Sequence, residues 1–125
     1  MERTIKIDGK QVKFKATAMT PRLYRQQFQR DLFIDIDTLG KEHTKAVNEN
    51  RSLTSEVLEI FYLIAYTMVK QADPEAVPDD PDEWLEGFGI FSIYQILPKI
   101  LQLWGINTQS TVNAKKKAKG KRNGS

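Results

Sequence analysis

The stretch TIKIDGKQVKFKA, residues 4–16, decides the fold because two alternating runs flank an Asp8-Gly9 pair. Such a pair favours a two-residue type I′ turn, which sets the pairs Ile7 with Lys10, Ile5 with Val12, and Arg3 with Phe14. The same register places four apolar side chains on one face, namely Ile5, Ile7, Val12 and Phe14. An isolated hairpin is only marginally stable in water, so we expect this face to pack on the helices that follow.

The residues after the hairpin have helical periodicity. Thr20 supplies a hydroxyl that can cap a helix, and Pro21 suits the first helical position, where its missing N–H leaves no partner unpaired. Apolar residues then recur at helical spacing, with a kink or break expected near Arg30-Asp31. Gly40 weakens or ends this pattern. Residues 41–52 are polar and aperiodic, which predicts a loop or a frayed helical extension.

A second helix is predicted from about Leu53 to Gln71. One stripe of this segment is apolar, and further apolar residues widen it nearly all the way round. The stripe consists of Leu53, Val57, Ile60, Phe61, Ile64, Ala65 and Met68. A helix that is apolar on most sides is typically the central helix of a core.

The segment ADPEAVPDDP, residues 72–81, contains three prolines and four acids, which excludes regular structure. At its end, Asp80 can cap a short helix, Pro81 suits the first helical position, and Glu83 completes a capping-box pattern. This short helix is expected to carry three apolar residues, Trp84, Leu85 and Phe88.

A last helix is predicted from a cap at Ser92 to Trp104, with Gly105 as a left-handed C-cap. Pro98 falls inside it and removes one backbone hydrogen bond, so we expect a kink. Its inward face consists of Ile93, Ile96, Leu97, Ile100, Leu101 and Trp104. The prediction is therefore an α+β domain over residues 1–107, mostly helical, with an N-terminal β-hairpin packed on a small helical core. Residues 108–125 are expected to form a disordered basic tail.

The charges are distributed unevenly. The net charge is +3, but residues 106–125 carry six basic and no acidic residues, whereas the other 105 residues carry 13 basic and 16 acidic ones. A basic tail can bind phosphate backbones by counterion release. No aromatic residue is interleaved to stack on bases, so a solvated end is the competing interpretation. A small nucleic-acid-binding protein that uses this tail is thus one alternative function.

No set of residues converges on a catalytic reaction, so we expect a protein that is not an enzyme and that holds no metal or cofactor. His43 is the only histidine and the chain has no cysteine, which excludes a zinc site. The acids of residues 73–83 lack the EF-hand pattern, and Gly87 and Gly89 form no phosphate loop. The longest uncharged apolar run, residues 60–69, has ten residues, about half of the roughly 20 that a membrane span requires.

Three segments in a fixed order resemble the tail assembly chaperones of long-tailed phages (siphoviruses) and prophages of Gram-positive bacteria. They are TIKIDGKQVKFKATAMTPRLYRQQFQRDL, AYTMVKQADP and EWLEGFGIFSIYQILPKILQLWGIN, and the resemblance covers residues 4 to about 107. It implies a non-enzymatic protein of the host bacterial cytoplasm that is absent from the mature virion. Such chaperones bind the long, helical tape measure protein and help to recruit tail-tube subunits. A general virion-assembly adaptor is an alternative function that the same resemblance leaves open.

The resemblance also bears on the binding residues and on the tail. A partner with apolar helical stripes can be covered by aromatic side chains. The candidate partner-binding residues are Trp84, Phe88, Phe91, Tyr94 and Trp104, for which core packing is the competing interpretation. In such phages a programmed frameshift often yields a longer form that contacts the tail-tube protein, and codons for Lys115-Lys116-Lys117 would form a slippery tract. The oligomeric state stays open, including a homo-oligomer.

Overall fold

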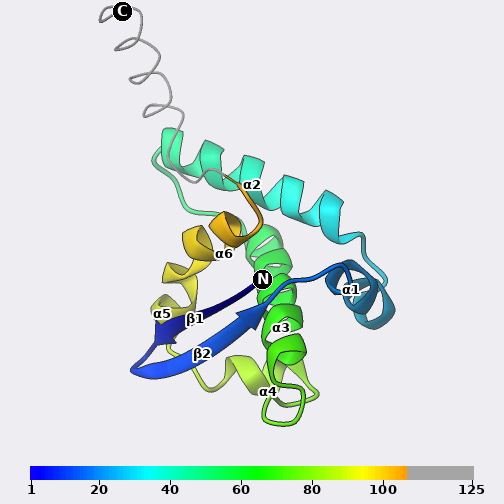
Figure 1. The fold of residues 1–125 in the computed structure, drawn as a ribbon. Helices are drawn as coiled ribbons and strands as arrows, with labels where there is room; N and C mark the ends of the chain where they lie inside the picture. The colour runs from blue at the N-terminus through cyan, green and yellow to red at the C-terminus, as the bar shows by residue number, and fades with distance from the viewer. Residues whose placement is uncertain (107–125) are drawn as a thin grey trace, which may run out of the picture.

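The computed structural model describes residues 1–106, in which a two-stranded antiparallel sheet is followed by six helices (Figure 1). In chain order the elements are β1 (Glu2–Ile7), β2 (Lys10–Lys15), α1 (Thr20–Phe28), α2 (Leu32–Asn48), α3 (Ser55–Ala72), α4 (Pro81–Leu85), α5 (Ile90–Gln95) and α6 (Leu97–Leu103). The predicted α+β class, mostly helical with an N-terminal hairpin, is confirmed. The predicted tail, residues 108–125, lies outside the described residues.

The hairpin has the predicted register. Ile7 pairs with Lys10 and Ile5 with Val12, and both turn residues have positive φ, 53° at Asp8 and 78° at Gly9. Positive φ at both central positions defines the expected type I′ turn. On the apolar face Ile5, Ile7 and Phe14 are buried and Val12 is partly buried. Figure 1 shows the hairpin lying across α3, which therefore supplies the support that an isolated hairpin lacks.

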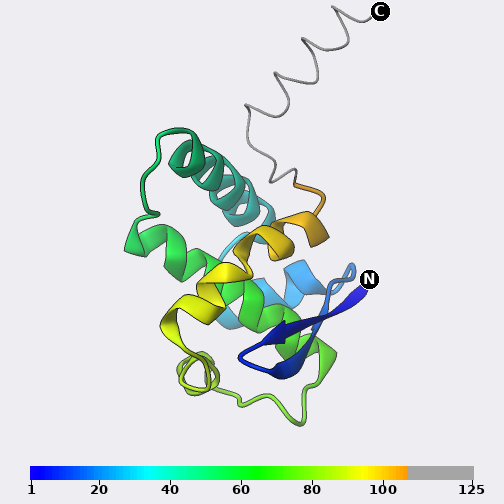
Figure 2. The ribbon, with the colours of Figure 1, turned by 90° about the vertical axis from the view of Figure 1, so that its left-hand side faces the viewer.

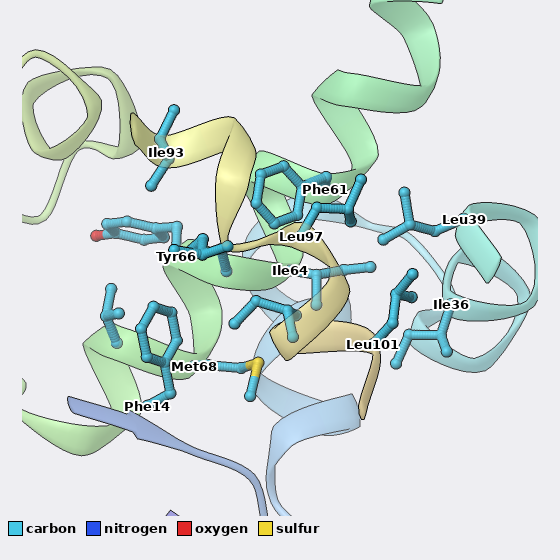
Figure 3. Close-up of a cluster of buried hydrophobic side chains, with 14 of the residues drawn as sticks. Phe14, Ile36, Leu39, Phe61, Ile64, Tyr66, Met68, Ile93, Leu97 and Leu101 are labelled. Carbon is cyan, nitrogen blue, oxygen red and sulfur yellow. The ribbon is translucent and has the colours of Figure 1, made fainter. Parts of the chain in front are cut away.

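Helix α3 is the central element, as predicted. It packs against β2, α1, α2 and α4. Phe61, Ile64 and Met68 are fully buried on it, and Figure 3 shows them among side chains of α2, α6 and the hairpin. The helix begins at Ser55 because the Thr54 hydroxyl accepts a hydrogen bond from the Val57 N–H at 3.3 Å.

The predicted cap of α1 is wrong. Met19 is the N-cap residue and makes no side-chain capping bond, while Thr20 lies inside the helix and is fully buried. The Thr20 hydroxyl accepts from the Thr17 N–H at 2.9 Å and donates to the Gln71 side chain at 2.5 Å. The hydroxyl thus joins α1 to the end of α3 instead of capping its own helix. Pro21 does lie in the first turn, as predicted.

The break predicted between α1 and α2 is confirmed. Gln29 has a left-handed conformation with φ of 55°, and the Asp31 side chain caps α2 by accepting from the Ile34 N–H at 3.1 Å. Helix α2 then runs through Gly40 to Asn48, so the loop predicted for residues 41–52 is wrong and the alternative of a helical extension describes most of it. The glycine at position 40 leaves space that the Ile106 side chain fills. A Cβ at this position would lie only 3.1 Å from Ile106 Cγ2.

A buried ion pair fixes the junction of α1 and α2. The guanidinium of Arg30 donates to both carboxylate oxygens of Asp35, at 2.6 and 3.0 Å, and the hydroxyl of the fully buried Tyr24 donates to the same carboxylate at 2.6 Å. Burial of Asp35 acts to raise its pKa, but the hydrogen bonds from Arg30 and Tyr24 outweigh burial and lower it. Asp35 is therefore charged at neutral pH.

The single kinked helix predicted from Ser92 to Trp104 is instead two helices. Helix α5 begins at Ile90, and the chain breaks at Ile96 so that Pro98 lies in the first turn of α6. A proline ring crowds the carbonyl four residues earlier, and a break removes that conflict because the first-turn N–H needs no partner. Two caps in the wider region from α4 to α6 agree with prediction.

At the start of the region, the Asp80 side chain accepts from the Asp82 N–H at 3.1 Å, as the predicted cap of α4 requires. At its end, Gly105 has φ of 77° and donates its N–H to Gln102 O, while the Ile106 N–H bonds to Leu101 O. These two bonds form a Schellman motif, which agrees with the predicted left-handed C-cap.

Candidate partner-binding surface

The tip of the hairpin holds the connection between α4 and α5. The Asp8 carboxylate accepts hydrogen bonds from the Gly89 N–H at 2.8 Å and from the Ser92 hydroxyl, and Lys10 Nζ donates to Gly87 O at 3.2 Å. The bond from Gly89, followed by the bond from Ser92, lowers the pKa of Asp8, so the tip presents a carboxylate to the start of α5. The connection is thus positioned by residues about 80 positions earlier in the sequence.

This contact explains why Ser92 does not cap the helix as predicted. Ser92 is the third residue of α5, and Gly89 occupies the N-cap position without a side chain of its own. A glycine N-cap leaves the first N–H groups of a helix without a side-chain acceptor. Asp8, from the hairpin, instead accepts from the N–H of Gly89 itself and from the hydroxyl of Ser92.

Two consecutive apolar residues, Ile90 and Phe91, project from the start of α5. Their exposed fractions, 73% and 76%, are the highest among the large hydrophobic residues of the described chain. The next turns of the segment point inward, with Ile93, Ile96 and Leu97 all buried. In Figure 2, α5 lies on the side of α3 that faces the viewer. Ile90 and Phe91 therefore form an apolar pair on a helix whose other side is anchored in the core.

Of the five residues predicted to bind a partner, only Phe91 is exposed. Trp84 is buried, with its ring centroid 6.1 Å from that of Tyr66 and 5.2 Å from that of Phe88. Phe88 is half-buried beneath Lys10, whose Nζ lies 5.5 Å from the ring centroid. Both rings stabilise the connection that carries the apolar pair.

Tyr94 and Trp104 are also half-buried. The indole N–H of Trp104 donates to Met68 Sδ at 3.3 Å, so this ring closes the core over α3. Ile90 is the exposed residue that sequence reasoning missed. Periodicity gave no signal for it, because Ile90 lies three residues before Ile93 and seven before Leu97 and so shares the spacing of the inward stripe.

Tyr94 connects the apolar pair to an open groove between α5 and the turn that joins α2 to α3. The groove has a volume of about 530 Å³, and its lining includes His43, Val47, Leu53 and Tyr94. Val47 is exposed, and burial lowers the pKa of His43, so this imidazole is less easily protonated than a free one. Tyr94 lies on the same short helix as the apolar pair and also lines this groove, so we define the α5 surface by Ile90, Phe91, Tyr94 and Val47.

Within residues 1–106, no group of three or more histidines or acids is placed to hold a metal ion. None of the helices in this part of the chain is long and apolar enough to cross a membrane. The α5 surface itself consists of apolar side chains, ring edges and a few hydrogen-bonding groups.

Comparisons with known proteins bring no further assignment. No family model matches the chain, and neither the curated proteins nor the solved structures give a match. A function is therefore inferred from the resemblance in motif order and from the α5 surface.

Proposed function

We propose that the chain is a non-enzymatic phage tail assembly chaperone that binds the tape measure protein through its α5 surface. The observation that carries the proposal is the apolar pair Ile90 and Phe91, which is exposed although the hairpin holds it in place. Rigidly supported, exposed aromatic side chains are typical anchors of protein interfaces. The ordered motifs of the sequence supply the identity of the partner.

The physical task of such a chaperone fits these residues. A long helical protein that is made before its assembly partners exposes apolar stripes, which aggregate in water unless they are covered. A ridge formed by Ile90, Phe91 and Tyr94 can lie along one such stripe, in the manner of helix packing. The same proposal places the protein in the host cytoplasm. A frameshifted longer form would recruit the tail-tube subunits.

The test is co-expression with a tape measure protein encoded by the same phage genome. We expect the chaperone to keep that protein soluble and to co-purify with it. The double variant Ile90→Ala/Phe91→Ala should reduce co-purification roughly tenfold or more, because truncation of an interface anchor costs at least about 1 to 2 kcal/mol. Its melting temperature should be unchanged, because exposed side chains contribute little to stability.

A matched control exists in the same chain. Phe33 and Ile34 are also consecutive, apolar and exposed, but they lie at the start of α2. Figure 1 shows that end of α2 beside α1, across α3 from α5. The variant Phe33→Ala/Ile34→Ala should capture the tape measure protein as well as the unmodified chain does. If both double variants capture it normally, the α5 surface is not the binding surface. If the tape measure protein is soluble alone, the chaperone proposal fails.

A further inference from the structure

The chain around the apolar pair is acidic. Between Lys70 and Lys99 the sequence contains seven acidic residues and no lysine or arginine. All seven are exposed: Asp73, Glu75, Asp79, Asp80, Asp82, Glu83 and Glu86. The segment that presents Ile90 and Phe91 thus carries charge of one sign.

Some of these acids are already occupied. Asp79 forms an ion pair with Lys70 at 2.7 Å, and Asp73 and Asp80 accept hydrogen bonds from nearby backbone N–H groups. Among the ion pairs of residues 1–106, none involves Asp82 or Glu86. Carboxylates without a cationic neighbour favour a partner that supplies one.

Glu83 and Glu86 are the acids best placed to act on the apolar pair. Glu83 also has no ion pair among the described residues, and Glu86 follows the last residue of α4, four positions before Ile90. The nearby cation Lys10 is directed to Gly87 O and to the ring of Phe88. Both acids are exposed and precede the apolar pair by four to eight residues, and we call Glu83 and Glu86 the acidic rim.

The shape of the surface selects the form of the partner. Ile90, Phe91 and Tyr94 occupy positions i, i+1 and i+4 of one helix, which is the spacing of a ridge that packs into the groove of another helix. The rim selects its charge, because a lysine or arginine beside an apolar stripe would face Glu83 and Glu86, whereas a glutamate would be repelled.

We infer that the α5 surface binds an amphipathic helix whose apolar stripe is flanked by lysine or arginine. This inference rests on the proposed function and specifies which part of the partner is captured. An acidic apolar helix and a nucleic acid backbone are both disfavoured by the same rim, since each brings negative charge to it.

Two synthetic helical peptides test the inference on the full chain. They share one stripe of leucines at helical spacing and differ only in their flanking residues, which are lysine in one and glutamate in the other. With fluorescently labelled peptides and anisotropy as the readout, we expect the lysine peptide to bind roughly tenfold or more tightly than the glutamate peptide. Its affinity should fall from low to physiological ionic strength, because salt screens exposed charges.

Variants separate the apolar and charged contributions. Glu83→Lys/Glu86→Lys should weaken binding of the lysine peptide several-fold and reduce its salt dependence. Glu56→Lys is the matched control, since Glu56 is an exposed acid at the start of α3 in a different groove, beside Arg30, and should change nothing. Ile90→Ala/Phe91→Ala should abolish binding of both peptides.

Three outcomes would overturn the inference. Equal binding of the two peptides would mean that the rim does not discriminate. Unchanged binding by Glu83→Lys/Glu86→Lys would place the charge selection elsewhere. Binding of the lysine peptide by Ile90→Ala/Phe91→Ala would reduce the effect to charge attraction alone. In each case capture of the tape measure protein through Ile90 and Phe91 could still succeed, so failure of the inference is distinguishable from failure of the proposed function.

Discussion

The first turns of α2 and α5 each expose two consecutive apolar residues, yet the two turns are held in different ways. At α2 the cap is Asp31, three residues before the capped N–H, and the buried network beneath it spans 11 residues from Tyr24 to Asp35. At the start of α5 the N–H of the N-cap residue Gly89 donates to the carboxylate of Asp8, which lies 81 residues earlier in the sequence. The start of α2 is therefore defined by its own neighbourhood, whereas the start of α5 is defined only after the hairpin has docked.

This difference bears on when each pair becomes available. The exposed fractions are comparable, 66% and 63% for Phe33 and Ile34 against 73% and 76% for Ile90 and Phe91. Only the second pair depends on contacts between the two ends of the domain. A partner that recognises a fixed arrangement of Ile90 and Phe91 would therefore bind the folded domain and not the unfolded chain.

The largest effect should come from Ile64→Asp, which removes the support that both regions share. Ile64 is fully buried on α3, and a carboxylate there must be desolvated or protonated. Either costs several kcal/mol against a total stability of about 5 to 15 kcal/mol. We expect the variant to lack a cooperative thermal transition by circular dichroism. A retained transition would contradict the central position of α3.

The next largest effect should come from Asp35→Ala, which breaks the α2 side alone. It leaves the Tyr24 hydroxyl and Arg30 without their acceptor. Breaking a buried ion pair costs about 3 to 5 kcal/mol, and we expect about 2 to 3 kcal/mol here because the Arg30 side chain is 43% exposed to solvent. Denaturant unfolding measures this loss. The control is Asp37→Ala, whose exposed pair with Lys41 should contribute less than about 1 kcal/mol.

Acid should weaken the same network. The folded pKa of Asp35 is lowered, so its contribution to stability is present above the unfolded value of about 3.9 and is lost as the pH falls through the folded pKa. The melting temperature of the unmodified chain should therefore decrease below about pH 4. In Asp35→Asn this decrease should be smaller. Parallel acid profiles for the two proteins would mean that other carboxylates control acid unfolding.

A smaller, local effect is expected from Asp8→Asn, which weakens the α5 side alone. Asparagine tolerates the positive φ of this turn, so the hairpin should keep its register while the contact to Gly89 and Ser92 loses its charge. Hydrogen exchange should accelerate at the first amides of α5 and stay unchanged at the start of α2, with little change in melting temperature. Equal exchange at both helices would remove the contrast between them.

The smallest effect should come from deletion of residues 108–125. The described helices and strands all lie within residues 1–106, and we expect the melting temperature to stay unchanged. The full chain should give no salt-sensitive gel shift with duplex DNA at physiological ionic strength. A shift that the deletion abolishes would instead favour the nucleic-acid-binding alternative.

The same contrast separates what could be predicted from sequence. The hairpin register, the central helix and the cap at Asp80 depend on neighbouring residues, and all three predictions are confirmed. The caps predicted at Thr20 and Ser92 are wrong because each hydroxyl bonds to a residue more than 50 positions away.

The site follows the same rule. From sequence alone Asp35 would be assigned to the surface, because its burial depends on the packing of α2 against α1. Phe91 was among the predicted binding residues, but its exposure, and that of Ile90, depends on which side of α5 the hairpin and the core cover.

The missing side chain of Gly40 gives Ile106 its place on α2. Ile106 packs against the middle of α2, and Figure 1 shows this point at the end of α6 that is remote from α5. The described chain consequently ends beside the middle of α2, the helix that also carries Val47 of the α5 surface. Even an alanine at position 40 would require the Ile106 side chain to shift by a few tenths of an ångström.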